Sequence, residues 1–440
     1  MTTGSRRRRS VSVWLTGTIV ALLWVGTAWA TPTTRLASVS SSETHGDGSS
    51  GGYWGGSISA DGRFVVFESS ATNLVSNDTN GDTDIFIRDR SKGTTRRISV
   101  SSSEAQTDDD SRRAVISPDG RFVLFVSAAT NLVGNDTNAA EDVFIRDRSK
   151  GTTRRVSIGN GEQQGNSFSY GHSMSPNGRF IVFASGSSNL VGADTNAASD
   201  IFVRDRHAGT TRRVSLSSGG IEGNASSDSP WISADGKLVA FSSNASNLVG
   251  GDSNGVGDVF VRNRETGRTK RISVSSAGGQ ADGDSDDSMI SADGRFVVFY
   301  STATDLVPGD DNGAADVFVR ILATEKTRVV SVSSAGEIGD AESWDPAISA
   351  NGRYVTFGSL ASNLVGIDTN AEHDVFVRDR KRATTSILSR TAGGSESNGL
   401  SFSATISDDG RFVVFSSDAT NLVADDTNNV SDVFVRGPLG

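Results

Sequence analysis

Short apolar runs alternate with polar stretches along the whole chain, and this pattern returns at a constant interval of 58 residues. Each unit contains one Asp-Gly or Asn-Gly pair. Seven pairs follow one another with no insertion or deletion, at Asp61-Gly62, Asp119-Gly120, Asn177-Gly178, Asp235-Gly236, Asp293-Gly294, Asn351-Gly352 and Asp409-Gly410. A fixed period of this kind is typical of solenoids and propellers.

The unit that runs from Ile116 to Ser157 shows what one repeat builds. Its turn has hairpin chemistry, because Pro118 presets φ and the Asp119-Gly120 pair accepts a positive φ. The polar stretch 127–141 has no strand pattern and predicts a long loop. Apolar or alternating runs predict strands at 121–126, 142–146 and 152–158. With a first strand before the turn, the unit has four antiparallel strands, which is the pattern of a propeller blade.

Phenylalanine supports this interpretation. Nineteen of the 21 Phe residues occupy three positions of the unit, those of Phe64, Phe67 and Phe86. The two exceptions among these positions are Leu238 and Tyr354. Rings that recur with the blades predict packing of blade against blade, with about 1.5–3 kcal/mol from each buried side chain.

The two ends of the repeat region predict how the ring closes. The last unit ends after its third strand, 432–436, and an unpaired copy of the fourth strand stands at Thr33–Ser41. Pairing of the two would complete blade seven and remove an open sheet edge. We therefore predict an all-β fold, a single seven-bladed β-propeller over residues 31–440, with four antiparallel strands per blade and the last blade closed by the N-terminal strand.

Two sequence runs carry a family resemblance. Ser-Pro-Asp-Gly-Arg-Phe-Val-Leu-Phe at 117–125, followed by Asp-Val-Phe-Ile-Arg-Asp at 142–147, resembles the WD-repeat-like propeller repeat of TolB-type proteins. The resemblance covers about 33–436 and implies a propeller fold, without implying a function. TolB itself has a separate N-terminal α/β domain and six blades, whereas this chain shows seven longer repeats.

Residues 1–30 have the pattern of a secretory signal peptide. A basic run, Arg6–Arg9, precedes an apolar segment at 11–25, and Ala28-Trp29-Ala30 offers a cleavage site. We expect cleavage after Ala30 and export to the periplasm or the medium. The alternative is an uncleaved anchor, because 11–30 is close to the ~20 residues that span a bilayer.

Composition narrows the range of partners. The net charge is −10, and it becomes −14 when the four arginines of residues 1–30 are removed. An acidic protein is a poor ligand for nucleic acid, and anionic lipid would repel it. The chain has no Cys and therefore no thiol chemistry. We expect a monomer whose partner is a protein or a glycan in the cell envelope or outside the cell.

The long loop of each unit contains an Asp-x-Asn-x-x-x-Asp motif, and blade one adds Asp82. Oxygen ligands that alternate along a turn are typical of calcium loops. The alternative is that these side chains bond nearby amides and only stabilise the loop. No cofactor is required by either interpretation, and Ca²⁺ is the candidate ion. The motif residues are Asp78, Asn80 and Asp84; Asp136, Asn138 and Asp142; Asp194, Asn196 and Asp200; Asp252, Asn254 and Asp258; Asp310, Asn312 and Asp316; Asp368, Asn370 and Asp374; and Asp426, Asn428 and Asp432.

A second candidate site lies seven residues before each turn pair, in a stretch predicted as the blade-to-blade loop (about 102–113). This position varies between blades, as binding positions on a repeat scaffold do. An aromatic arc there could stack on sugars or anchor a peptide; the alternative is that the rings only fill their own loops. The candidate ligand-binding residues are Trp54, Arg112, Tyr170, Trp344 and Phe402, and blades four and five carry Asp228 and Asp286.

Catalytic motifs are sparse. The four His residues fall at unrelated repeat positions, and no serine has a base at a matching spacing. The sequence therefore favours a non-enzymatic binding module that engages its ligand on the long-loop face. The alternative is an extracellular lyase or hydrolase that acts on polysaccharide or peptide. In that case Asp228 and Asp286, on adjacent blades, are the first carboxylates to test.

Overall fold

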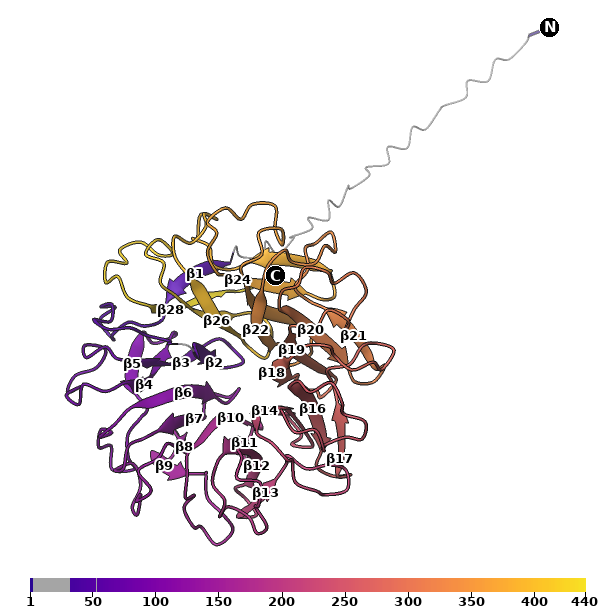
Figure 1. Cartoon of the computed structure of the whole chain (residues 1–440). Coiled ribbons are helices and arrows are strands. Elements are labelled where there is room, and N and C mark those ends of the chain that lie inside the picture. The colour runs from indigo at the N-terminus through magenta and orange to yellow at the C-terminus, as the bar shows by residue number, and fades with distance from the viewer. Residues whose placement is uncertain (3–31, 53) are drawn as a thin grey trace. The chain divides into compact units, whose positions relative to one another are not determined.

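The computed structural model describes residues 1–2, 32–52 and 54–440. The predicted signal peptide lies almost wholly outside the described residues. Thr31–Gly440 forms one compact unit. In this unit seven four-stranded sheets surround a central axis (Figure 1). No helix of the described residues has the length and apolar character needed to cross a membrane.

The innermost strand of each blade lines the axis. These strands are β2 (Gly56–Ile58), β6 (Ser111–Ile116), β10 (Ser169–Met174), β14 (Ser227–Ile232), β18 (Ser285–Ile290), β22 (Ser343–Ile348) and β26 (Ser401–Ile406). The second strands are β3 (Phe64–Ser69), β7 (Phe122–Ser127), β11 (Phe180–Ser185), β15 (Leu238–Ser243), β19 (Phe296–Ser301), β23 (Tyr354–Ser359) and β27 (Val413–Ser417). They are nearly all buried, as continuous apolar runs require.

The third and fourth strands form the outer half of each blade. The third strands are β4 (Asp84–Asp89), β8 (Asp142–Asp147), β12 (Asp200–Asp205), β16 (Asp258–Asn263), β20 (Asp316–Ile321), β24 (Asp374–Asp379) and β28 (Asp432–Gly437). The fourth strands are β5 (Thr94–Arg97), β9 (Thr152–Arg155), β13 (Thr210–Arg213), β17 (Arg268–Arg271), β21 (Lys326–Val329), β25 (Thr384–Ile387) and β1 (Thr33–Leu36).

Blade seven is closed by the N-terminal strand, as predicted. Strand β1 pairs antiparallel with β28, and its register runs from Thr33 opposite Gly437 to Leu36 opposite Phe434. The sheet order β1-β28-β27-β26 therefore joins the two ends of the chain in one blade. The all-β, seven-bladed propeller predicted from the sequence is confirmed.

The recurring Phe residues form the core between blades. Phe67 and Phe86 are fully buried, with ring centroids 6.0 Å apart, and the same pair recurs in the other blades. Phe64 lies over the turn of the next blade. A Cβ on Gly120, which has φ of +72°, would lie 2.4 Å from Cδ2 of Phe64. The turn glycine is therefore required both by its backbone conformation and by the ring that packs on it.

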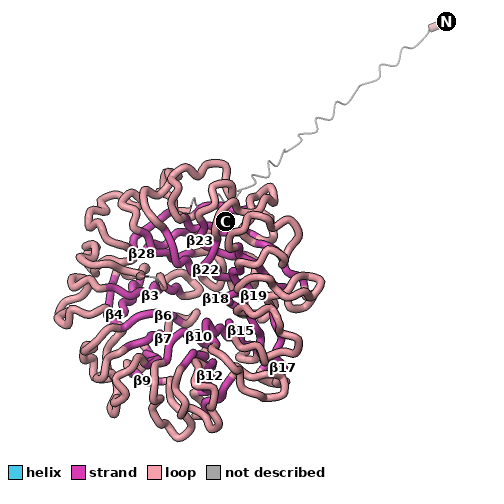
Figure 2. The backbone as a smooth tube through the Cα atoms, in the orientation of Figure 1, coloured by secondary structure: helices cyan, strands magenta, loops and turns pink. Residues whose placement is uncertain are grey.

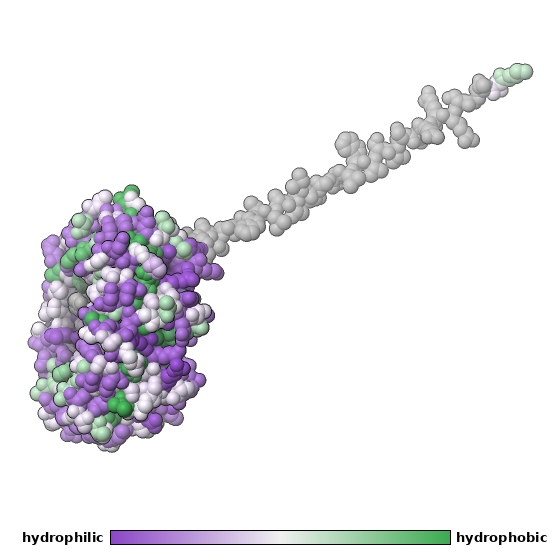
Figure 3. All heavy atoms as spheres, turned by 45° about the vertical axis from the view of Figure 1, so that its right-hand side comes forward, coloured by the Kyte–Doolittle hydropathy of each residue, from purple (hydrophilic) through white to green (hydrophobic). Residues whose placement is uncertain are grey.

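In every blade the loop between the second and third strands is hydrogen-bonded to the connection that enters the blade, and such loops surround the strands of the ring (Figure 2). In blade two the Asn131 side chain donates to the Gln106 carbonyl (2.9 Å), which joins the loop 127–141 to the preceding connection. One boundary was wrong. The connection predicted over 102–113 ends at 110, because β6 begins at Ser111. The surface view in Figure 3 is mostly hydrophilic with scattered apolar residues.

Candidate active site

A cavity of about 400 Å³ follows the axis of the ring. It is lined by the innermost strand of every blade. One end is mostly apolar and is formed by the turns that contain Pro118, Pro176, Ala234, Ala292 and Ala350, with Asp408 at the equivalent position of blade seven. The other end, the channel mouth, carries most of the polar residues. An apolar cavity with a few convergent polar groups is the usual form of a ligand site.

The channel mouth is built from the residues at the start of each innermost strand. In six blades a bulge lies there, because the pairing register shifts, for example between Arg112 and Val115 in β6. In every blade one residue at this position has a positive φ, and in five blades it is not glycine. These residues are Gly55 (φ 64°), Arg113 (57°), Gly171 (52°), Ser229 (50°), Asp287 (47°), Asp345 (51°) and Ser403 (52°). A left-handed non-glycine residue costs of order 1–3 kcal/mol, and such residues cluster at functional sites. The bulge turns these side chains toward the channel, and all except Gly55 line the cavity.

Contacts connect one side of the mouth from blade to blade. The Arg113 guanidinium lies over the Trp54 ring (4.0 Å to the centroid) and near the Tyr170 ring (5.1 Å). The backbone amide of Arg113 donates to Oε2 of Glu68 (2.8 Å). The Tyr170 hydroxyl donates to Oδ2 of Asp228 (3.0 Å). Blades one to four therefore form a continuous series of aromatic, cationic and acidic side chains.

The other side of the mouth is linked in the same way, with one difference. The Ser229 hydroxyl donates to Oδ1 of Asp287 (3.3 Å), and the Ser403 backbone amide bonds the Asp345 carboxylate. Gly55 packs closely on the Ser403 carbonyl. Between blades five and six, however, the neighbours are Asp287 and Asp345, and the negative charge of Asp345 acts on Asp287. Two acids of adjacent blades therefore line the same side of the cavity at this junction of the ring.

Burial changes the proton affinity of these acids. Burial, with the charges of Asp286 and Asp345 added, raises the pKa of Asp287 to about 7. Burial raises the pKa of Asp345 to about 6, although the Ser403 amide acts in the opposite direction. Burial also raises the pKa of Asp228, against the hydrogen bonds from the Ser229 amide and the Tyr170 hydroxyl. A carboxyl group that holds its proton near neutral pH can act as a general acid.

The structure brings three of the sequence-nominated residues to the cavity, Trp54, Tyr170 and Asp228. Arg112 is exposed and pairs with Asp110 (2.5 Å). The remaining three do not line the cavity: Trp344 stacks on the buried His373 ring (4.8 Å), the Asp286 carboxylate accepts the Asp287 amide (2.7 Å), and Phe402 pairs through its backbone with Ser416.

The sequence interpretation chose the position seven residues before each turn pair and missed the next position, six residues before the pair. Arg113, Ser229, Asp287, Asp345 and Ser403 occupy it, with glycine in the other two blades, and it also varies from blade to blade. Variation between blades therefore marks both of these adjacent positions. The bulge decided which of two adjacent residues faces the channel.

The Asp-x-Asn loops are fixed by their own hydrogen bonds. In blade one the Asn80 amide donates to the Thr107 carbonyl (3.1 Å) and accepts the Asp82 amide (3.4 Å). In blades one to four an arginine of the fourth strand lies between the two Asp carboxylates. A close group of three acids, Asp194, Asp200 and Glu222, has the geometry of metal ligands, but Arg213 pairs with all three.

The fold and the channel mouth define a β-propeller whose axial cavity is lined by several buried or half-buried acids. No protein-family model and no curated protein matches the sequence. Among solved structures, an oligogalacturonate lyase from Vibrio parahaemolyticus is 12% identical and has a TM-score of 0.54, with 92% of this chain and 97% of that chain covered. An acylaminoacyl peptidase from Pyrococcus horikoshii is 10% identical with a TM-score of 0.52, and the match covers 89% of this chain and 52% of that one.

A putative TolB from Agrobacterium tumefaciens is 17% identical with a TM-score of 0.42, and the match covers 78% of this chain and 94% of that chain. The propeller fold that the resemblance implies is confirmed by the seven four-stranded sheets. At these sequence identities the comparisons show a shared fold and nothing about shared active-site residues.

The prediction of a non-enzymatic binding module was wrong. Solved structures that match with TM-scores above 0.5 include enzymes by name, namely oligogalacturonate lyases, prolyl endopeptidases and an acylaminoacyl peptidase. The sequence argument against an enzyme relied on the absence of a His-based triad. Its enzymatic alternative named Asp228 and Asp286, and it missed Asp287 and Asp345 because these two side chains reach the channel only through the bulge.

Proposed function

We propose that the protein is a propeller hydrolase that cleaves glycosidic bonds of a polysaccharide, with Asp287 and Asp345 as its acid and base. The observation that carries the proposal is that these two acids, on adjacent blades, line one cavity and that the charge of Asp345 acts on Asp287. Glycoside hydrolysis uses two carboxyl groups on either side of the scissile bond, one protonated and one ionised.

The different environments of the two acids suggest their roles. Asp287 has the higher pKa, about 7, and keeps its proton at a pH where Asp345, with a pKa of about 6, is ionised. Asp287 would protonate the leaving-group oxygen as the bond to the anomeric carbon breaks. Asp345 would take a proton from the attacking water, whose oxygen bonds to that carbon. One product is the leaving group, which departs with the proton from Asp287. The other product is the sugar that carries the water-derived hydroxyl on its anomeric carbon.

The charges of the mouth favour an uncharged or cationic sugar. A bound glycan would meet Asp228, Asp287 and Asp345, and Arg113 is the cation that lines the cavity among the described residues. Carboxylates of a polyuronate would be repelled by these acids. The oligogalacturonate named for the fold neighbours is therefore not the substrate we expect. Trp54 and Tyr170 offer ring faces on which a sugar can stack.

The proposal includes the cellular context expected from the sequence. Residues 1–30 would direct export and be cleaved after Ala30, or remain as an anchor, and the glycan partner would lie in the envelope or outside the cell. The enzyme would act as a monomer, because all seven blades of one chain complete the cavity.

The test measures the release of reducing ends from a panel of neutral glycans, chitosan-type cationic glycans and polygalacturonate, and the release of new amino groups from peptides. We expect cleavage of a neutral or cationic glycan, with a bell-shaped pH profile centred between about 6 and 7. Asp287→Asn and Asp345→Asn should each lower kcat/KM by at least about 100-fold, as expected for loss of a general acid or base.

The matched control is Asp293→Asn. Asp293 lies in the turn after β18, and Asn177 and Asn351 stand at this position in other blades, so the fold accepts Asn there. We expect full activity from this variant. The proposal is wrong if no glycan of the panel is cleaved, or if both channel variants keep the activity of the wild type.

A further inference from the structure

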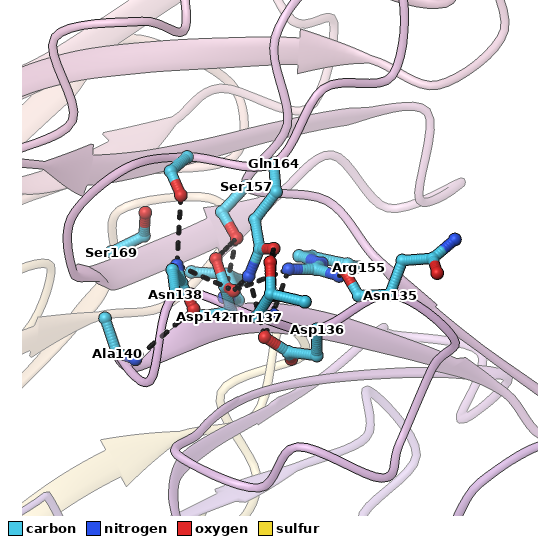
Figure 4. A network of polar contacts seen from close by, with 12 residues as sticks. Asn135, Asp136, Thr137, Asn138, Ala140, Asp142, Arg155, Ser157, Gln164 and Ser169 are labelled. Carbon is cyan, nitrogen blue, oxygen red and sulfur yellow. Dashed lines mark hydrogen bonds and ion pairs between the residues drawn. The ribbon is translucent and has the colours of Figure 1, made fainter.

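The loops with the Asp-x-Asn-x-x-x-Asp motif differ between blades in their counter-ion. In blade two the Arg155 Nη1 lies 3.3 Å from Oδ1 of Asp136 and 3.0 Å from Oδ2 of Asp142. Figure 4 shows the guanidinium between the two carboxylates, with Gln164 beside it. Arg97, Arg213 and Arg271 occupy the same place in blades one, three and four. All four arginine side chains are buried, so each provides the positive charge that its two acids need.

Blades five, six and seven have no arginine at this position. The fourth-strand residue is Val329, Ile387 or Leu36. The two aspartates of the loop are nevertheless retained in each blade. An apolar side chain therefore replaces the cation while the charges that it would balance remain buried. An isolated buried carboxylate is unfavourable, so a positive partner is expected to come from elsewhere.

The clearest case is blade five. Asp310 is only 7% exposed, and neither of its carboxylate oxygens has a hydrogen-bond partner among the described residues. Its charged neighbours are all acids: Asp316, Asp311 and Asp282. Asp311 stands where the other six loops carry Thr or Ser, so this loop has gained a carboxylate while it lost the arginine.

The two other loops are partly balanced. In blade six the Arg390 guanidinium lies 3.8 Å from Glu396, and its charge lowers the pKa of Asp368, although burial and neighbouring acids raise that pKa overall. In blade seven His45 stands near Asp426 and Asp432 and acts on both. Only blade five, among the described residues, lacks a basic side chain beside its acids.

We propose that the blade-five loop binds one hard divalent cation of the calcium class through the carboxylates of Asp310 and Asp316. The donors are all oxygen, which is the ligand set that Ca²⁺ prefers, and backbone carbonyls and water complete such sites. The Asn312 amide donates to Oδ2 of Asp316 (2.7 Å) and to the Gly339 carbonyl (2.8 Å), and so positions the second carboxylate. This inference does not depend on the proposed hydrolase activity.

The experiment is isothermal titration calorimetry of the full chain with CaCl₂ after treatment with chelator. We expect saturable binding at one site, together with a higher unfolding midpoint in Ca²⁺ than in chelator. Val329→Arg copies the arrangement of blades one to four and should abolish that binding. The matched control Val329→Leu keeps an apolar side chain and should bind as the wild type does.

Asp310→Asn provides a second route to the same answer if Val329→Arg does not fold. It keeps the shape of the side chain and should weaken Ca²⁺ binding at least tenfold, with a raised unfolding midpoint in chelator because an unbalanced charge is removed. Absence of saturable binding to the wild type at millimolar Ca²⁺ would overturn the proposal. Unchanged binding by both Val329→Arg and Asp310→Asn would also overturn it, because the ion would then lie elsewhere.

Discussion

Replacing Asp287 by Asn tests the raised pKa at the channel mouth without any knowledge of the substrate. The pKa of Asp287 is about 7 in the folded protein, because burial and neighbouring acids disfavour its charge, and it is about 3.9 in an unfolded chain. Between these values the folded state binds more protons than the unfolded state. The stability of the wild type therefore falls as the pH rises from about 4 to about 7.

The size of this effect follows from the difference in pKa. At 1.36 kcal/mol per unit, about three units give at most about 4 kcal/mol. Partial exposure of Asp287 and the charge it shares with Asp286 and Asp345 reduce this to about 2–4 kcal/mol. For a unit of this size the entropy of unfolding is about 0.9 kcal/mol/K, so the midpoint changes by about 2–5 °C.

Asp287→Asn removes the ionisation and should be more stable than the wild type at pH 8 by this amount, and nearly equal to it at pH 4. Calorimetric unfolding at several pH values measures the difference. The control Asp293→Asn should instead be less stable than the wild type at pH 8. Hydrogen bonds from Ser291 and the Arg295 amide outweigh burial and lower the pKa of Asp293, so its charged form stabilises the fold. A difference between wild type and Asp287→Asn that stays constant from pH 4 to pH 8 would refute the reasoning.

Two further predictions concern the propeller itself. Gly120→Ala places a Cβ 2.4 Å from Cδ2 of Phe64 at φ of +72°, and should destabilise the fold by about 1–3 kcal/mol; Gly134→Ala, which meets nothing within 4 Å, is the control, and equal midpoints would contradict the prediction. Deletion of Thr33–Leu36 exposes the edge of β28 and should lower the midpoint further and admit proteases to blade seven. Unchanged cooperative unfolding and protease resistance would show that β1 is not needed for closure.

Most of the fold could be predicted because the repeat makes its signals redundant. Each Phe position and each turn pair occurs in nearly every blade, so one ambiguous strand is corrected by its equivalents. The closure by β1 could be predicted by counting strands. The last repeat lacks its fourth strand, and an unpaired copy of that strand stands before the first repeat. Strand ends were less certain, as β9 ends at Arg155 although its pattern continues to 158.

The candidate site could be predicted only to within one residue. A β-bulge places two residues of one strand opposite one residue of its partner, so the alternation of inside and outside changes there. In blade five this change takes Asp286 away from the cavity lining and brings Asp287 into it. Nothing in the local sequence specifies the bulge, because its seven residues range from Gly to Arg and Asp. The bulge is a property of how the innermost strand pairs with the second strand of its blade.

The counter-ions of the loops are a different case, because the signal was present in the sequence. The two aspartates of each loop recur in all seven units and were therefore the residues that the sequence analysis selected. The arginine that balances them lies in another strand and recurs in only four units. Its absence from blade five becomes meaningful only when the structure shows that Val329 occupies the place of a buried guanidinium.

The energetic cost of the channel acids is an argument that they are retained for chemistry. Raised pKa values of about 7 and about 6 correspond to at most about 4 and 3 kcal/mol of lost stability above neutral pH. That is a large share of the 5–15 kcal/mol that holds a typical domain together. The fold does not need them, because blades one and three carry Gly55 and Gly171 at the same bulge. Acids that weaken the ring, at a position where glycine suffices, are best explained by a reaction that requires them.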